Sequence, residues 1–377
     1  MFELTDEQRM IQLMVREFAR EKIAPVAAEN DRTGTFPQDI IKQMGQLGLM
    51  GMMIDERWGG CGAGAVSYVL ALQEIAWACA STAVTMSVNN LTCEPIYRNG
   101  TDEQKKLYLE PIASGSGLGA FAITEPDAGT DAGSARLKAD LKKDKYILNG
   151  AKAFITNGSH ATVFLVIART GGQPGSRGLS AFIVERDTPG LIIGAPEKKM
   201  GLRASSTVPL TFEDCAVPAA NLLGREGEGF RIAMEALDSG RIGISSQAIG
   251  IARAALDEAI DYAKERKQFN RPIARFQAIQ WMIADAARDI EAAQWLSLHA
   301  AALKEQGKPL TREASIAKLF ATEAANRICY DSLQIHGGYG YIQDYKIERL
   351  YRDARVTTIY EGTSEVQRIV IANSMLK

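Results

Sequence analysis

Near the end of the chain lies the stretch Thr358-Ile359-Tyr360-Glu361-Gly362-Thr363-Ser364-Glu365-Val366-Gln367-Arg368. An apolar run reaches Glu361, a glycine follows, and Ser364 and Gln367 have the S-x-x-Q spacing of a capping box. Apolar residues then recur at helical spacing. The stretch therefore predicts a helix that begins at this box, with Glu361 immediately before it.

Glu361 has two interpretations at this point. As a structural residue, an acidic side chain at a helix N-terminus interacts favourably with the helix dipole, which is worth about 0.3 to 1 kcal/mol. As a functional residue, Glu361 is a base, while Gly362 lets a ligand approach the backbone and Thr363 and the free amides face an anion. These residues alone leave both interpretations open.

Composition narrows the class of protein. A chain of 377 residues predicts two or three domains, and a net charge of -2 gives no electrostatic footprint for nucleic acid. No uncharged apolar run approaches the roughly 18 residues of a membrane helix, so we expect no membrane insertion. The 5 cysteines and 3 histidines are scattered, which argues against a disulfide framework or a metal site. We expect a cytoplasmic protein of bacterial type; a mature protein of the mitochondrial matrix would have the same features.

Sequence periodicity divides the chain into three regions. Residues 1–118 have helical patterns, which include a capping box at Thr5 and Gln8 and one long buried helix from Tyr68 to Asn89. Residues 119–225 have short β-branched and aromatic runs, with Asn149-Gly150 predicting a hairpin or loop between two strands. Residues 226–377 contain long, alanine-rich helical segments. We predict an α+β multidomain fold with an N-terminal helical domain, a middle β-barrel-like or sandwich domain and a C-terminal four-helix bundle.

Five separated motifs resemble those of the acyl-CoA dehydrogenase family of flavoproteins, in the order typical of that family and along essentially the whole chain. They are FAITEPDAGTDAG (121–133), AFITNG (153–158), RKQF (266–269), QIHGGYGY (334–341) and IYEGTSEVQR (359–368). The resemblance is strongest to short-chain members of the butyryl-CoA type. It implies FAD-dependent dehydrogenation of a short-chain, branched or alicyclic acyl-CoA to the 2-enoyl-CoA, with Glu361 abstracting the α proton and N5 of FAD taking the β hydride.

The resemblance also implies a set of binding residues. It assigns the flavin site to two groups of positions and assigns Gln334, Gly337 and Gly338 to a neighbouring subunit. The first group is Phe121, Ile123, Thr124, Thr130, Phe154 and Thr156, and the second is Arg266, Gln268, Phe269 and Gln277, with Thr363 and Glu365 near the base. The implied substrate contacts are Thr130, Leu237, Asp238, Arg241, Tyr360 and Gly362.

Several of these positions have plainer interpretations. Thr124 to Gly133 could be an Asp/Gly turn between strands, and Phe154 a core residue. Asp238 and Arg241 lie one helical turn apart and could form a surface ion pair worth a few tenths of a kcal/mol. Some relatives place their catalytic glutamate at the position of Gly240, where glycine cannot act as a base. Glu361 is therefore the only base that the motifs support.

The resemblance implies two kinds of partner. Reduced flavin would pass its electrons to an electron-transferring flavoprotein, and the subunits would form a homotetramer, a dimer of dimers. Two rival functions remain open: a flavin-dependent acyl-CoA oxidase that consumes oxygen, and a catalytically silent paralogue that acts as a binding or assembly protein.

Overall fold

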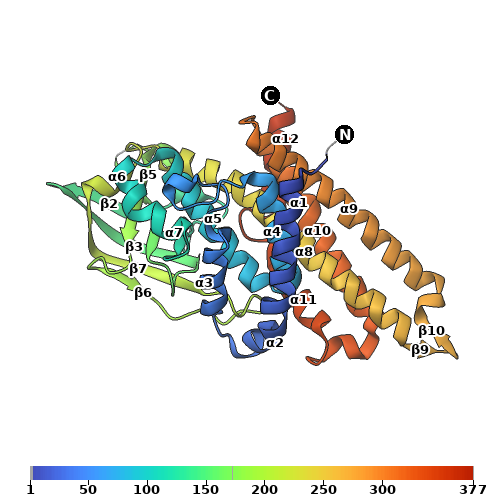
Figure 1. The fold of residues 1–377 in the computed structure, drawn as a ribbon. Helices are drawn as coiled ribbons and strands as arrows, with labels where there is room; N and C mark the ends of the chain where they lie inside the picture. Colours follow the sequence, from blue (N-terminus) through green and yellow to red (C-terminus); the bar gives the residue numbers. More distant parts are fainter. Residues whose placement is uncertain (1–2, 172, 377) are drawn as a thin grey trace.

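The computed structural model describes residues 3–171 and 173–376. Figure 1 shows a sheet at one end of the molecule, long C-terminal helices that extend to the other end, and N-terminal helices between them. This arrangement confirms the predicted fold class of a helical, a β and a second helical region.

Among the described residues, seven α-helices form the N-terminal region, and two of them, α1 and α6, begin at capping boxes. At α1 the amide of Gln8 donates to Thr5 Oγ1 at 3.2 Å and the amide of Thr5 donates to Gln8 Oε1 at 3.0 Å, which confirms the predicted capping box. The helices are α1 (Asp6–Phe18), α2 (Ala24–Thr33), α3 (Gln38–Gln46), α4 (Gly64–Ala78), α5 (Ala80–Asn99), α6 (Asp102–Gln104) and α7 (Glu110–Ala113).

The prediction of one helix from Tyr68 to Asn89 was wrong. The chain leaves the helical conformation at Cys79, whose φ of -156° and ψ of 113° separate α4 from α5. Both helices are buried almost throughout, so the apolar pattern continues across the break and periodicity cannot reveal it. The break lets α4 and α5 pack against each other and against the C-terminal helices.

The middle region forms one mixed sheet of eight strands in the order β6-β7-β3-β2-β4-β5-β8, with β1 paired to β4. The expected hairpin or loop at Asn149-Gly150 was wrong, because both residues lie inside the long strand β3. Gly150 has a φ of 141° at a register shift against β7, so the pair forms a bulge. The strands are β1 (Gly119–Ala122), β2 (Lys138–Lys142), β3 (Lys145–Thr156), β4 (Val163–Arg169), β5 (Leu179–Glu185), β6 (Leu191–Ile193), β7 (Thr207–Pro218) and β8 (Leu222–Leu223).

The C-terminal region is built on three long helices. Alanine-rich faces let α8 pack closely along α10, α9, α4 and α5. A small hairpin of β9 and β10 lies at the far tip of α8 and α9, opposite the sheet (Figure 1). The elements are α8 (Gly229–Glu265), β9 (Lys267–Gln268), β10 (Arg271–Pro272), α9 (Gln277–Glu305), α10 (Thr311–His336), α11 (Lys346–Ala354) and α12 (Ser364–Met375).

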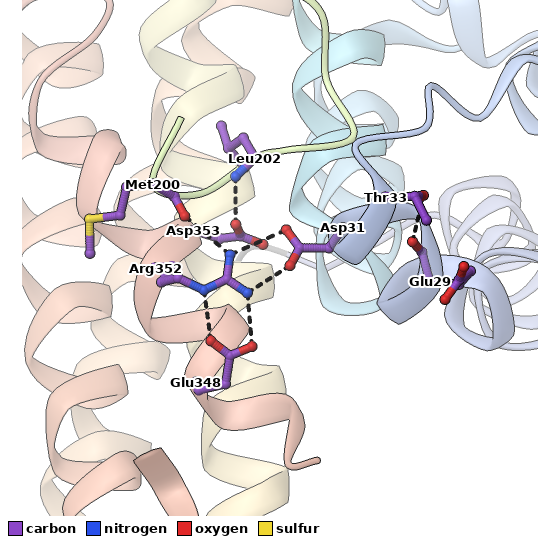
Figure 2. Close-up of polar contacts among 8 residues, drawn as sticks. All are labelled: Glu29, Asp31, Thr33, Met200, Leu202, Glu348, Arg352 and Asp353. Atoms are coloured by element: carbon purple, nitrogen blue, oxygen red, sulfur yellow. Dashed lines mark hydrogen bonds and ion pairs between the residues drawn. The ribbon is translucent and has the colours of Figure 1, made fainter. Parts of the chain in front are cut away.

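A polar cluster joins all three regions next to the segment that leads to Glu361. Arg352 of α11 donates to Asp31 of α2 at 2.6 Å and to Glu348 at 2.7 Å, and also to the carbonyl of Met200 (Figure 2). The neighbouring Asp353 accepts from the amide of Leu202 at 2.6 Å. These contacts anchor α11 on the N-terminal helices and on the loop between β6 and β7, so the position of the following segment is fixed from two sides.

Candidate active site around Glu361

The turn that carries Glu361 has an unusual backbone. Glu361 has a φ of 51° and Gly362 a φ of 89°, and the first of these is costly for a residue with a side chain. The side-chain amide of Gln367 donates to the carbonyl of Glu361 at 3.2 Å and to that of Gly362 at 2.9 Å, which holds the turn. Strained backbone of this kind occurs preferentially at functional sites.

The predicted capping box at Ser364 and Gln367 was wrong. The N-cap of α12 is Thr363, whose hydroxyl accepts from the amide of Val366 at 3.4 Å. Gln367 is buried and turns its side chain back to the preceding carbonyls. Since Thr363 and Ser364 are equally good cap residues, the sequence left the choice between them to the tertiary contacts of Gln367.

The carboxylate of Glu361 rests against α8 at Gly240. A β-carbon placed on Gly240 would lie 2.0 Å from Glu361 Oε2, so only glycine leaves room for the carboxylate in this position. Leu91 of α5 lines the same space, since its Cδ1 would lie 3.2 Å from that β-carbon. The Oε2 atom is buried and has no hydrogen-bond partner among the described residues.

Burial sets the chemistry of this carboxylate. It raises the pKa of Glu361 from the ordinary 4.5 to about 7, while the positive charges of Lys318 and Arg241 act in the opposite direction. The helix-dipole interpretation is not needed, because Thr363 caps α12. A buried carboxylate whose pKa lies near neutral pH is suited to accept a proton from a weakly acidic carbon.

Asp238 and Arg241 form a buried pair and not the surface ion pair of the plainer interpretation. Arg241 Nη1 lies 2.5 Å from Asp238 Oδ1, and the two side chains are 5% and 17% exposed. Thr311 of α10 donates its hydroxyl to the other oxygen of Asp238. Arg241 Nε is buried without a partner in the described part of the chain, so the guanidinium retains one donor beside Glu361.

The remaining implied substrate residues are divided between this site and the sheet. Tyr360 lies half-buried with its hydroxyl on Gln247, and Leu237 packs against the core next to α5. Thr130 is exposed in the loop after β1, which is far from Glu361 in the sequence.

Phe154 and Thr156 flank the buried Ile155 near the end of β3, and both are more exposed than it is. Phe154 occupies a register shift, has a φ of 58° and is 66% exposed. It is therefore not the core residue of the plainer interpretation. A strained backbone that holds a large aromatic ring at the surface is suited to a planar aromatic ligand.

Sequence reasoning missed the pair that supports the neighbouring loop. Lys152 is fully buried, and its Nζ donates to Glu125 Oε1 at 2.8 Å and to the carbonyl of Ile123 at 2.9 Å. Glu125 also accepts from the amides of Arg136 and Leu137 at 2.6 and 2.9 Å. A lysine at a buried position of a strand was the available signal. The pair holds the loop that begins at Thr124.

Four other implied flavin residues lie together at the far tip of the long helices. Arg266, Gln268, Gly337 and Gly338 line one cavity of about 530 Å³, where the guanidinium of Arg266 lies 5.4 Å from the ring centre of Tyr339. Aromatic and cationic side chains in a cavity suit a nucleotide. The residues that the resemblance assigned to different subunits therefore line one cavity of a single chain.

Several implied residues have simpler surroundings. Phe269, at the hairpin of β9 and β10, is 87% exposed with a φ of 53°. Phe121 is buried in the core between the sheet and α5, and Ile123 packs against the same core. The implied residues exposed elsewhere on the surface are Gln277, Gln334 and Glu365.

Models of one protein family match nearly the whole chain. Family models match the N-terminal domain of acyl-CoA dehydrogenases over residues 5–116, the middle domain over residues 120–215 and the C-terminal domain over residues 227–376. The chain belongs to the acyl-CoA dehydrogenase family. Members of this family use FAD, so the protein is an FAD-dependent oxidoreductase.

Individual acyl-CoA dehydrogenases are similar over their whole length. The short-chain specific acyl-CoA dehydrogenase of Clostridium acetobutylicum is 48% identical over 377 residues and 100% of both chains. The solved butyryl-CoA dehydrogenase from Megasphaera elsdenii is 44% identical, with a TM-score of 0.98 over 100% of both chains. A solved structure described as the electron transferring flavoprotein of Acidaminococcus fermentans contains a chain that is 49% identical, with a TM-score of 0.99 over 100% of both. The chain is therefore similar over its whole length to acyl-CoA dehydrogenases that are named for short-chain substrates.

The surroundings of Phe154 fit the flavin that this family uses. The exposed ring lies beside Thr156 on β3, and the backbone of the Thr124 loop is fixed through the buried Lys152.

No group of three His, Cys, Asp or Glu side chains that could hold a metal ion occurs in residues 3–171 and 173–376. In the same residues no helix is both long and apolar enough to cross a membrane.

Proposed function

We propose that this acyl-CoA dehydrogenase oxidises the Cα–Cβ bond of a short saturated acyl-CoA, and that Glu361 takes the α proton. The observation that carries the proposal is the Glu361 carboxylate, which is buried against Gly240 with a pKa of about 7. A straight short chain is the leading substrate because the short-chain specific relative is similar over the whole chain. Branched and alicyclic acyl groups are the alternatives.

Proton removal needs a base and stabilisation of the oxygen on which negative charge develops. Glu361 supplies the base above pH 7, where the carboxylate is mainly ionised. Its own backbone N–H, held by the strained turn, is the donor that we assign to the thioester carbonyl. Bound FAD supplies the oxidant that accepts the β hydrogen as hydride.

Residues from the middle region and from the C-terminal region would hold the cofactor. We assign the flavin ring to Thr124, Phe154 and Thr156, and the adenosine diphosphate portion to the cavity of Arg266 and Gln268. Gly240 lies beside the base, and Arg266 lies at the C-terminal end of α8. The length of helix between them is about 39 Å, at about 1.5 Å per residue.

That separation is longer than a 20-residue helix of about 30 Å, and we infer that one dinucleotide does not span it within a chain. The cavity at the tip of the helices would therefore serve the flavin of a neighbouring subunit. This geometry supports a site that takes residues from more than one chain, and we propose a homotetramer, a dimer of dimers, as the assembly.

An electron-transferring flavoprotein is the electron acceptor that we propose for the reduced enzyme. The similarity to a chain in the Acidaminococcus fermentans structure supports this choice. A cytoplasmic location belongs to the same proposal, with the mitochondrial matrix as the alternative location.

Anaerobic absorbance titration of the purified holoenzyme tests the proposal. Butyryl-CoA, a branched acyl-CoA and cyclohexanecarbonyl-CoA would each be added to the yellow oxidised protein. We expect butyryl-CoA to bleach the flavin, and electron-transferring flavoprotein to restore the colour faster than oxygen does. Rapid reoxidation by oxygen would favour the oxidase alternative. A holoenzyme that no acyl-CoA bleaches would contradict the proposed substrate class and favour the silent paralogue.

A further inference from the structure

Lys318 is a buried cation on the face of α10 that packs toward the base. Its side chain is 0% exposed, and burial lowers its pKa to about 8. In the described part of the chain its ammonium donates to one acceptor, the carbonyl oxygen of Gly362, at 2.7 Å. Burying a charged ammonium costs several kcal/mol, so a lysine at this position needs a compensating interaction.

The first compensating interaction is with the backbone of the turn. Gly362 O accepts from Lys318 Nζ at 2.7 Å and from Gln367 Nε2 at 2.9 Å, so two buried donors from α10 and α12 converge on one carbonyl. A β-carbon on Gly362 would lie 2.6 Å from Gln367 Nε2, which shows how closely this donor approaches. The two donors fix the peptide plane that follows Gly362, and Gln367 also donates to the carbonyl of Glu361 at 3.2 Å, so these contacts together offset the cost of the positive φ at Glu361.

The second compensating interaction is electrostatic. The charged groups that act on the Glu361 carboxylate are Arg241 from α8 and Lys318 from α10. Arg241 is already neutralised in part by Asp238 at 2.5 Å, whereas the one acceptor that Lys318 has among the described residues is a neutral carbonyl. The charge of Lys318 is therefore the freer of the two to act on Glu361.

The other titratable groups around this pair are weaker influences. Glu365 of α12 is exposed and acts on Lys318 from the solvent side. The hydroxyls of Tyr68 on α4 and of Tyr360 remain neutral, because burial and the charge of Glu361 raise the pKa of both. Glu361 and Lys318 thus form the principal titrating pair of the site.

We propose that Lys318 is a positioning residue for proton abstraction, which holds the Gly362 carbonyl in place and favours the ionised form of Glu361 through its charge. The inference rests on the proposed role of Glu361 as the base. Lys318 itself does not contact the reacting atoms: it orients the turn that presents the carboxylate and the backbone N–H of Glu361.

Two variants separate the contributions of Lys318. Lys318→Met removes both the charge and the hydrogen bond to Gly362, and Gln367→Leu removes the side-chain hydrogen bonds to the carbonyls of Glu361 and Gly362 but leaves the charge. We expect Lys318→Met to lower kcat about 10- to 100-fold at pH 7 with a smaller change in KM, because misplacing a catalytic group by about 1 Å can cost 100-fold. The acid limb is the part of the pH profile in which flavin reduction slows as Glu361 becomes protonated. We expect this limb to move to higher pH in Lys318→Met. Gln367→Leu should lower kcat and leave the limb in place.

Controls distinguish these effects from misfolding. Lys346→Met removes a largely buried lysine that pairs with Glu258 at 3.4 Å, away from the turn, and should leave the acid limb unchanged. Flavin content and the thermal unfolding midpoint report whether each variant is folded. If Lys318→Met does not fold, Lys318→Arg keeps the charge and should retain the wild-type limb with a lower kcat. An acid limb at the wild-type pH in folded Lys318→Met, or a displaced limb in Lys318→Arg, would overturn the proposal.

A stability cycle tests the same coupling without turnover. Between the pKa of Glu361, about 7, and that of Lys318, about 8, both groups are charged, and there Lys318→Met should change the unfolding midpoint differently in the wild-type and Glu361→Gln backgrounds, because only the wild type retains the carboxylate. Equal changes in both backgrounds would contradict the electrostatic part of the proposal. A wild-type enzyme that no acyl-CoA reduces would refute the proposed function instead, while this cycle would still report the coupling between Lys318 and Glu361.

Discussion

Replacing Glu361 with glutamine should make the protein less active and, at alkaline pH, more stable. The wild-type carboxylate is buried, and none of the residues that the structure describes forms a hydrogen bond with its Oε2, so ionising it costs free energy in the folded state. Glutamine has nearly the same shape and carries no charge. We therefore expect Glu361→Gln to lower turnover by about 100- to 10,000-fold through loss of the base, while removing the cost of the buried charge.

The magnitude of the stability change follows from the pKa. Burial raises the pKa of Glu361 from 4.5 to about 7, and a difference of one pH unit corresponds to about 1.36 kcal/mol. The full effect is therefore about 3 kcal/mol. Because the folded-state pKa is the higher one, the carboxylate costs nothing below pH 4.5, costs progressively more as the pH rises, and has its full cost above about pH 7.

Thermal unfolding of both holoproteins between pH 5 and pH 9 measures this difference. The variant and the wild type should unfold at similar temperatures at pH 5, and the variant should become the more stable protein above pH 8. Glu17→Gln, at an exposed position of α1, is the matched control and should show no such divergence. A variant that is less stable than the wild type at pH 8, or equally stabilised at every pH, would refute the reasoning.

Three further substitutions test other contacts. Gly240→Ala would place a β-carbon 2.0 Å from Glu361 Oε2 and should lower kcat by up to about 100-fold with intact folding; unchanged kcat would show that the carboxylate does not need this space. Arg266→Ala should weaken FAD retention, so that dialysis releases the cofactor; full flavin content after dialysis would contradict the assignment of the cavity. Arg352→Met leaves buried acidic partners unpaired and should cost about 3 to 5 kcal/mol in urea unfolding. The exposed pair of Arg32 and Glu29 is its control and should give a much smaller loss, and equal losses would contradict the linking role of Arg352.

Local sequence patterns were sufficient for the helices with clear caps and for the placement of Glu361 before a helix. Thr5 and Gln8 predicted their capping box correctly because both partners lie within one helical turn. The same kind of pattern failed at Ser364 and Gln367, where a buried amide binds preceding carbonyls instead. It failed at Cys79 and Asn149-Gly150 because a helix break inside a buried segment and a bulge inside a strand leave the apolar pattern unchanged.

The sequence by itself determined the family, the three regions and the identity of the candidate base, because each motif is a short contiguous segment and the order of the motifs can be read directly from the chain. Only the tertiary structure decided that Glu361 lies against Gly240 and that the positive charges of Lys318 and Arg241 lower its pKa, against the effect of burial. It also decided that the sheet, to which Phe154 belongs, and the hairpin of β9 and β10, which directly follows Arg266, lie at opposite ends of the molecule (Figure 1). Burial, distance and charge environment arise from residues far apart in sequence, and they set the pKa and the geometry on which the chemistry depends.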